Sequence, residues 1–134
     1  MNPEISIVIP CFNEEEAIPI FYEETLRVLK TMSLSSFEFV FIDDGSSDRT
    51  LEVLKEISAK DKSVHFVSFS RNFGKEAALY AGLSKANGDF ISVMDVDLQD
   101  PPSLLPQMLE AILKEGYDCA ATRRVTRKKE PPVR

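Results

Sequence analysis

The chain has 134 residues, of which 43% are hydrophobic, 22 are acidic and 16 are basic, so its net charge at pH 7 is −6. This length fits one globular domain with a buried core, and the composition excludes a disordered or collagen-like chain. No run of residues approaches the ~20 apolar residues of a membrane span, and the N-terminal residues lack the pattern of a signal peptide.

The charge is distributed unevenly along the chain. Residues 123–134 contain six Lys/Arg and one Glu, a charge of +5, so residues 1–122 carry −11. An acidic body suits nucleic acid poorly, and we expect no nucleic-acid partner. The basic segment can meet anionic lipid or a phosphate group, although a solvated, flexible end is the more frequent meaning of such a run. We therefore predict an α/β domain over residues 1–122 and a flexible basic tail over residues 123–134.

Short β-branched and aromatic runs alternate with longer amphipathic runs, which predicts alternating strands and helices. In chain order we predict a strand at residues 5–9, a helix at 15–32, a strand at 38–42, a helix capped by Ser47 or Asp48, a strand at 64–69, a helix at 75–86, a strand at 90–94, a helix between Asp100 and Gly116, and a candidate fifth strand at 119–122. The first helix has an apolar stripe, which we expect to be buried: Ile18, Phe21, Leu26, Leu29 and Met32.

Regular alternation of strands and helices predicts a Rossmann-like, mostly parallel sheet with helices on both faces. In such sheets ligands bind beyond the carboxyl ends of the strands. Polar, non-repetitive segments follow all four of the first predicted strands, at residues 10–14, 43–46, 70–75 and 95–100. We expect these segments to meet at one rim of the sheet and to form a binding site there.

Two carboxylates, Asp95 and Asp97, stand one residue apart where the fourth predicted strand stops. Side chains alternate faces along a strand, so both would point the same way if the extended conformation persists. Two carboxylates ~6 Å apart repel by roughly 3 kcal/mol at an effective dielectric of about 20. A divalent cation would remove this repulsion and could hold a diphosphate. The alternative for the pair by itself is a solvated acidic turn.

Several common catalytic arrangements lack parts in this chain. His65 is the only histidine and lies within a predicted strand, so a serine-protease-like triad or a His-rich zinc site is incomplete. Gly74-Lys75 resembles the end of a P-loop, but Phe69 stands where that motif needs glycine, and no Gly-x-Gly-x-x-Gly occurs. Cys11 and Cys119 are too few for a disulfide framework, which favours a reducing compartment and buried, unreactive thiols.

Taken together, four segments resemble the family 2 glycosyltransferases with the GT-A fold. These segments are Ile7 to Glu15 (IVIPCFNEE), Ile42 to Thr50 (IDDGSSDRT), Ser70 to Ala78 (SRNFGKEAA) and Asp95 to Pro102 (DVDLQDPP). The last two look most like the branch that loads a hexose onto a polyprenyl phosphate, as dolichol-phosphate mannose synthases do. The resemblance covers about residues 5–123 and implies a metal-dependent glycosyltransferase of glycan or cell-envelope biosynthesis.

The resemblance implies roles for particular residues. Pro10, Phe12 and Glu14 would line the nucleoside pocket, and Asp44 would accept a hydrogen bond from the base. Asp95 would lie near the ribose and the metal, and Asp97 would ligate the Mg²⁺ or Mn²⁺ that bridges the diphosphate. The last two residues implied, which match a basic segment near the phosphates, are Arg71 and Lys75.

The same positions have simpler structural interpretations. Asp48 and Asp100 are expected to cap helices, and Asp43 can orient the turn that Gly45 permits. Pro10 and Phe12 can be strand-end and core residues. Arg71 can be a surface residue or can pair with Asp44.

The resemblance also implies partners and a location. The donor would be a UDP- or GDP-linked sugar, and the acceptor a lipid phosphate, at the cytoplasmic face of a membrane. In this family the acceptor-side carboxylate lies in the half after the donor site, so no residue here is assigned as the catalytic base. We therefore expect these 134 residues to be the donor-binding half of a transferase, which could bind the donor without transferring the sugar.

Two other classes stay open from the sequence. One is a non-catalytic nucleotide-sugar-binding or scaffold module that assembles with another chain, or with a second copy as a homo-oligomer. The other is a phosphate-accepting receiver domain, which also alternates strands and helices. In receiver domains the acidic pair usually follows the first strand, whereas Asp43-Asp44 follows the second.

Overall fold

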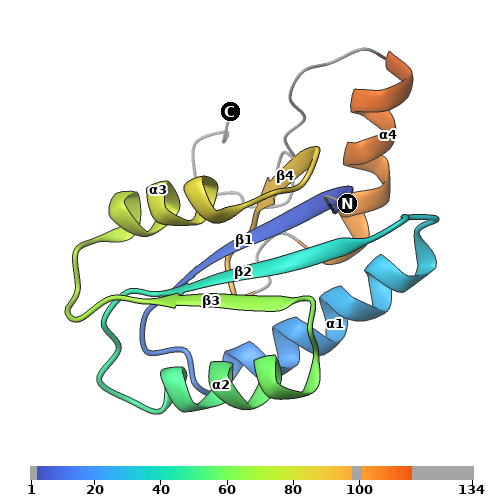
Figure 1. Cartoon of the computed structure of the whole chain (residues 1–134). Helices are drawn as coiled ribbons and strands as arrows, with labels where there is room; N and C mark the ends of the chain where they lie inside the picture. The colour runs from blue at the N-terminus through green and yellow to red at the C-terminus, as the bar shows by residue number, and fades with distance from the viewer. Residues whose placement is uncertain (1–2, 98–100, 116–134) are drawn as a thin grey trace, which may run out of the picture.

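The computed structural model describes residues 3–97 and 101–115. The elements in chain order are β1 (Ile5–Cys11), α1 (Ala17–Thr31), β2 (Phe37–Asp43), α2 (Thr50–Lys60), β3 (Val64–Ser68), α3 (Lys75–Lys85), β4 (Phe90–Val93), the short 3-10 helix η1 (Pro102–Leu104) and α4 (Leu105–Glu115). The four strands form one sheet in the order β3-β2-β1-β4, and every neighbouring pair is parallel (Figure 1). The predicted parallel α/β architecture is confirmed.

The predicted elements occur in the predicted order, with small shifts at their ends. β1 and β2 extend to Cys11 and Asp43, and β4 ends at Val93. The N-cap of α2 is Arg49 and not the predicted Ser47 or Asp48, although the Asp48 carboxylate accepts a hydrogen bond from the amide of Thr50, the first residue of α2, at 2.9 Å. The predicted cap Asp100, the helix end at Gly116, Cys119, the candidate strand at 119–122 and the tail at 123–134 lie outside the described residues.

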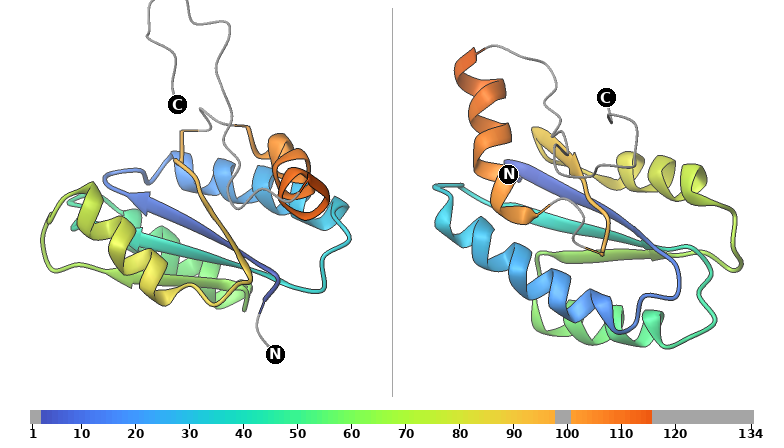
Figure 2. Two further views of the ribbon diagram at one scale, coloured as in Figure 1. Left: turned by 90° about the horizontal axis from the view of Figure 1, so that it is seen from above. Right: turned by 180° about the vertical axis from the view of Figure 1, so that it is seen from behind.

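The sheet carries helices on both faces, with α3 on one face and α1 and α2 on the other (Figures 1 and 2). On the α1 face, the stacked rings of Phe39 and Phe41 lie 5.9 Å apart and Phe21 of α1 meets Phe41 edge-on at 6.2 Å. All three rings are fully buried, which contributes roughly 2–3 kcal/mol for each side chain. The predicted stripe of α1 is correct for Ile18, Phe21 and Leu29, whereas Leu26 and Met32 are only partly buried because Thr25 and Val28 occupy the inner positions.

On the opposite face of the sheet, small residues of α3 let this helix pack close to the strands. Val8, Val40 and Ile42 of the sheet form a separate core with Ala78 of α3. A side chain at Gly82 would place its Cβ 2.4 Å from Cγ1 of Val8 and 2.7 Å from Cδ1 of Ile42. The glycine therefore allows α3 to lie close against β1 and β2, which fixes the position of its first residues relative to the sheet.

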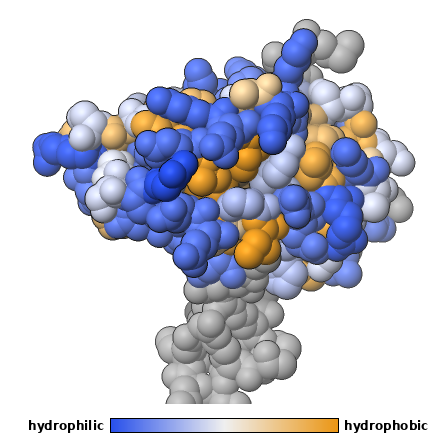
Figure 3. All heavy atoms as spheres, turned by 90° about the horizontal axis from the view of Figure 1, so that it is seen from below, coloured by the Kyte–Doolittle hydropathy of each residue, from blue (hydrophilic) through white to orange (hydrophobic). Residues whose placement is uncertain are grey.

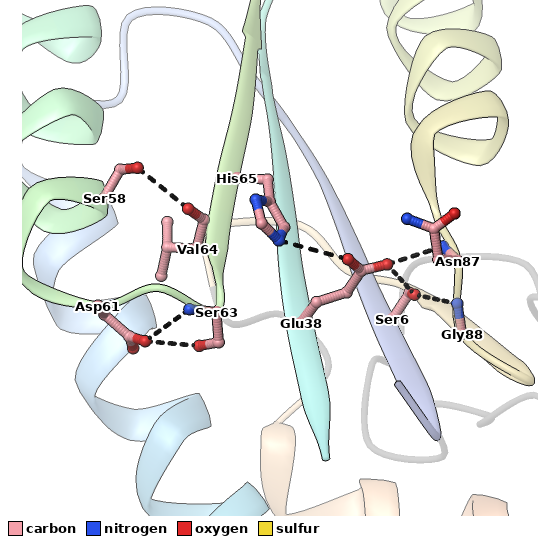
Figure 4. Close-up of polar contacts among 9 residues, drawn as sticks. All are labelled: Ser6, Glu38, Ser58, Asp61, Ser63, Val64, His65, Asn87 and Gly88. Carbon is pink, nitrogen blue, oxygen red and sulfur yellow. Dashed lines mark hydrogen bonds and ion pairs between the residues drawn. The ribbon is translucent and has the colours of Figure 1, made fainter. Parts of the chain in front are cut away.

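A buried carboxylate ties the connection between α3 and β4 to the amino ends of the strands (Figure 4). Glu38 accepts hydrogen bonds from the Ser6 hydroxyl at 2.6 Å and from the Asn87 amide at 2.8 Å. The Ser6 hydroxyl oxygen in turn accepts a bond from the Gly88 amide at 2.8 Å. His65 lies 3.5 Å from the second oxygen of Glu38. This contact indicates that His65 has a structural role, far from the carboxyl ends of the strands.

Polar side chains cover most of the face seen from below, and apolar side chains appear there in separate areas (Figure 3). Single exposed apolar residues are normal on proteins. Across residues 3–97 and 101–115, the helices are too short or too polar to cross a membrane.

Replacing Glu38 by alanine is expected to lower the free energy of unfolding by about 2 kcal/mol, because the Ser6 hydroxyl and the Asn87 amide would lose their buried acceptor. Urea unfolding at pH 7 measures this change. Glu38→Gln keeps one acceptor oxygen and should lose about half as much. Equal stability of Glu38→Ala and the natural chain would show that the network does not stabilise the fold.

Candidate functional site

An open pocket of about 390 Å³ lies beyond the carboxyl ends of the strands. The loops after β1, β2 and β4 and the first residue of α3 line it, with these residues: Pro10, Cys11, Phe12, Glu14, Asp44, Lys75, Asp95, Val96 and Asp97. The volume is within the range of small-molecule sites. The structure therefore brings together every residue that the sequence assigned to the site except Arg71.

The wall formed by the β1–α1 loop is part apolar and part acidic. Phe12 exposes 46% of its surface, so it presents apolar surface to the pocket. Burial raises the pKa of Glu14 above its ordinary value, and the negative charges of Asp97, Asp48 and Asp95 raise it further. Burial also raises the pKa of the Cys11 thiol, followed by the charges of Glu14 and Asp43. Cys11 is buried, as predicted, and among the described residues that line the pocket the carboxyl groups outnumber the single cation, Lys75.

The floor of the pocket is organised by Asp44, which is 4% exposed. Its Oδ1 accepts a hydrogen bond from the Phe73 amide at 2.8 Å, and its Oδ2 accepts bonds from the Gly74 amide at 3.1 Å and the Asn72 side chain at 3.2 Å. Asp44 thus holds the loop that leads into α3. A carboxylate offers about four acceptor positions, so Asp44 can accept one more hydrogen bond from a ligand.

The turn after β2 lies directly against the loop after β3. Gly45 has a φ of +73°, and a Cβ there would come within 2.2 Å of the Arg71 carbonyl carbon. Any side chain at this position would push the two loops apart. Asp43 accepts a hydrogen bond from the Ser46 amide at 3.0 Å, which confirms that it orients this turn.

Arg71 is exposed and is not among the residues that line the pocket. Its guanidinium lies over the ring of Phe73, 4.3 Å from the ring centre. The interpretation of Arg71 as a surface residue fits this contact better than a pair with Asp44, whose oxygens are bonded to residues 72–74.

Asp95 and Asp97 both line the pocket, but for a different reason from the one predicted. β4 ends at Val93, and the chain turns at residues 96–97, so strand alternation does not relate the two carboxylates. Val96 between them is 4% exposed and is anchored in the core on the α1 face. Lys75 Nζ lies 3.0 Å from Asp95 Oδ1 and is the only cation that lines the pocket among the described residues.

The donor chemistry of the pocket fits a hard divalent cation, since carboxylate oxygens are the preferred ligands of Mg²⁺ and Mn²⁺. A cation would also offset the negative charge that raises the pKa of Glu14. Within residues 3–97 and 101–115, no three Asp, Glu, His or Cys side chains are arranged to hold a metal by themselves. A cation at Asp95 and Asp97 would therefore need further oxygen ligands from a bound phosphate or water.

Sequence reasoning missed the residues that connect the first two loops. Asn13, Ser46 and Thr50 form hydrogen bonds across a separation of more than 30 residues in the chain. Asp48, predicted only as a helix cap, also accepts a bond from the Glu15 amide at 3.3 Å. The only sequence signal was that these polar residues follow strands that were predicted to lie in one sheet.

Comparison with known proteins gives relatives along nearly the whole chain. Residues 6–134 match the family model described as glycosyl transferase family 2. The chain is 47% identical over 124 residues to a prophage bactoprenol glucosyl transferase homolog of Escherichia coli K12, covering 92% of this chain and 40% of that protein. It is 38% identical over 126 residues to an undecaprenyl-phosphate 4-deoxy-4-formamido-L-arabinose transferase of Photorhabdus laumondii, covering 92% of this chain and 38% of that protein. The chain thus spans about 40% of the length of the curated relatives it matches.

Solved structures share the fold. The mannosyltransferase PcManGT from Pyrobaculum calidifontis, in complex with GDP-Man and Mn²⁺, superposes with a TM-score of 0.67 at 22% identity, covering 84% of this chain and 33% of that one. S. aureus TarS 1–349 in complex with UDP superposes with a TM-score of 0.57 at 27% identity, covering 70% of this chain and 27% of that one. The family match over residues 6–134 argues against a receiver domain, and the chain belongs to glycosyl transferase family 2.

Proposed function

We propose that the protein transfers a hexose from a UDP- or GDP-linked sugar to a polyprenyl phosphate, and that the pocket described above binds the nucleotide donor. The observation that carries this proposal is the meeting of Asp44, Lys75, Asp95 and Asp97 in one pocket at the carboxyl ends of parallel strands. The names of the relatives, which act on bactoprenol and undecaprenyl phosphate, support the choice of a lipid acceptor.

In this proposal the nucleoside binds at the wall formed by Pro10, Phe12 and Glu14. The exposed ring of Phe12 offers an apolar surface to a planar base, and burial against a ligand would remove that surface from water. Asp44 accepts a hydrogen bond from the base. Its bonds to residues 72–74 use three of its acceptor positions, and about one position remains for the base.

The diphosphate binds beside Asp95 and Asp97, which would hold Mg²⁺ or Mn²⁺. When bound, the cation stabilises the charge that develops on the departing nucleoside diphosphate. Lys75 balances the charge of Asp95 in the ligand-free pocket. With a donor present, the Lys75 ammonium releases Asp95 and turns to a phosphate oxygen. Arg71 does not line the pocket and would have to leave the Phe73 ring to reach the phosphates.

The acceptor side of the reaction is not assigned to any described residue. Transfer needs a group that deprotonates or positions the acceptor. We place that group in the part of the relatives' length that this chain does not span. A lipid phosphate acceptor would support a reaction at a membrane surface, and we propose its cytoplasmic face.

Donor binding is tested by calorimetric titration of this chain with UDP and GDP, each with and without Mn²⁺. We expect binding that requires Mn²⁺, and the preferred nucleotide identifies the base of the donor. A folded sample that binds neither nucleotide would contradict the proposal for this chain. Transfer is tested separately, by extraction of labelled lipid after incubation with radiolabelled donor and polyprenyl phosphate in detergent.

Replacing Asp97 by asparagine is expected to weaken Mn²⁺-dependent nucleotide binding by at least about tenfold, because a carboxylate ligand of the cation becomes neutral while its shape is kept. The same titration measures this loss, and thermal unfolding should be unchanged. Asp89→Asn is the matched control, since Asp89 is exposed at the amino end of β4, away from the pocket. Equal nucleotide affinity of Asp97→Asn and Asp89→Asn would refute the metal role of Asp97.

Replacing Lys75 by methionine is expected to act in opposite directions on the two ligands. Mn²⁺ alone should bind about two- to fivefold more tightly, because Asp95 loses a competing cation in a solvent-exposed pair. Nucleotide in the presence of Mn²⁺ should bind about tenfold more weakly, because a charge-assisted bond to phosphate is lost. Lys85→Met, at the other end of α3, controls for the loss of one positive charge. A parallel change in both affinities would contradict the exchange of partners.

A further inference from the structure

The loop that follows β1 is joined to residues 46–50 by several hydrogen bonds. Three successive amides of the first loop donate to side chains of residues 46–50, which include the first residue of α2: Asn13 to the Ser46 hydroxyl at 2.9 Å, Glu14 to the Thr50 hydroxyl at 2.9 Å and Glu15 to the Asp48 carboxylate at 3.3 Å. Residues 46–50 thus accept hydrogen bonds from three consecutive backbone amides of the first loop.

Asn13 completes the connection in the reverse direction. Its side-chain oxygen accepts bonds from the Ser47 amide at 2.9 Å, the Ser47 hydroxyl at 3.3 Å and the Asp48 amide at 3.3 Å. Asn13 also has a φ of 54°, and it is the only residue other than glycine with positive φ among the described residues. Asparagine tolerates this left-handed conformation better than most residues. One side chain therefore fixes both the backbone turn and its attachment to the neighbouring loop.

The residues on either side of Asn13 are pocket residues. Phe12 and Glu14 both line the pocket, whereas Asn13 itself does not. A left-handed residue between them reverses the local direction of the chain, so the directions of the Phe12 ring and the Glu14 carboxylate depend on it. We propose that Asn13 is a positioning residue, which holds Phe12 and Glu14 in place for the nucleoside by bridging the β1–α1 loop to residues 46–50.

A general contribution to stability is the competing explanation, and the structure argues against it as the main role. Asn13 and Ser47 are exposed, and neither belongs to a core cluster. Hydrogen bonds at such a surface add little net stability because water competes for the same groups. They do restrict the conformation of the β1–α1 loop, and a binding site formed by a loop needs its side chains held in fixed directions. As a role in nucleotide binding, this inference rests on the proposed function.

Three variants separate the parts of this role. Asn13→Ala removes the acceptor and disfavours positive φ, whereas Asn13→Gly removes the acceptor but permits the same backbone. Asn87→Ala is the matched control, because Asn87 is also exposed and uses its backbone amide, not its side chain, to bond Glu38 at the amino ends of the strands, away from the pocket. For each variant, NMR amide exchange of residues 12–15 is measured without ligand, and the UDP or GDP affinity is measured by calorimetry with Mn²⁺.

We expect faster amide exchange at Glu14 and Glu15 in both Asn13 variants, and nucleotide binding weakened about tenfold in Asn13→Ala and somewhat less in Asn13→Gly, with Asn87→Ala unchanged. Unchanged exchange at these amides in Asn13→Ala would overturn the inference whether or not nucleotide binds. Unchanged affinity in Asn13→Ala, with the natural chain binding nucleotide, would overturn it as well. Absence of binding by the natural chain would instead contradict the proposed function, and the exchange measurement would still decide whether Asn13 holds the loop.

Discussion

The shape of the pocket depends on a buried carboxylate that has to find hydrogen-bond donors. Asp44 is almost wholly removed from water, and its oxygens take donors from residues 72–74. A buried carboxyl group is costly unless its oxygens are hydrogen-bonded, so the position of Asp44 fixes the loop before α3. The contact of Gly45 with the backbone of Arg71 closes the remaining space between the two loops.

The segment after β2 occupies this central place because of the order of the strands. β2 lies between β1 and β3, so its loop has a neighbour on each side. Asp44 and Gly45 contact the loop after β3, and residues 46–50 contact the loop after β1. One short segment therefore sets the position of two others, and through them the position of Phe12, Glu14 and Lys75 around the pocket.

The electrostatics of the pocket follow from the same arrangement. Glu14, Asp95 and Asp97 line the same pocket, and the pKa of Glu14 is raised first by burial and then by the charges of Asp97, Asp48 and Asp95. Lys75 offsets part of that charge through Asp95. A site with this balance favours a ligand that brings a cation together with an anionic group, and a metal-bound diphosphate is such a ligand.

The sequence by itself determined the strands and helices, their parallel arrangement and the rim at which the polar loops meet, because apolar periodicity and strand-helix alternation are local signals. It also identified Asp95 and Asp97, although the extended conformation expected for them gives way to a turn that buried Val96 anchors. Only the tertiary structure decided that Arg71 lies outside the pocket against Phe73, that Asp44 binds the loop before α3, and that Asn13 joins two loops. Some of these contacts link residues far apart in the chain, and others depend on which of several possible partners lies within reach. Local sequence patterns do not predict long-range contacts or the choice among partners.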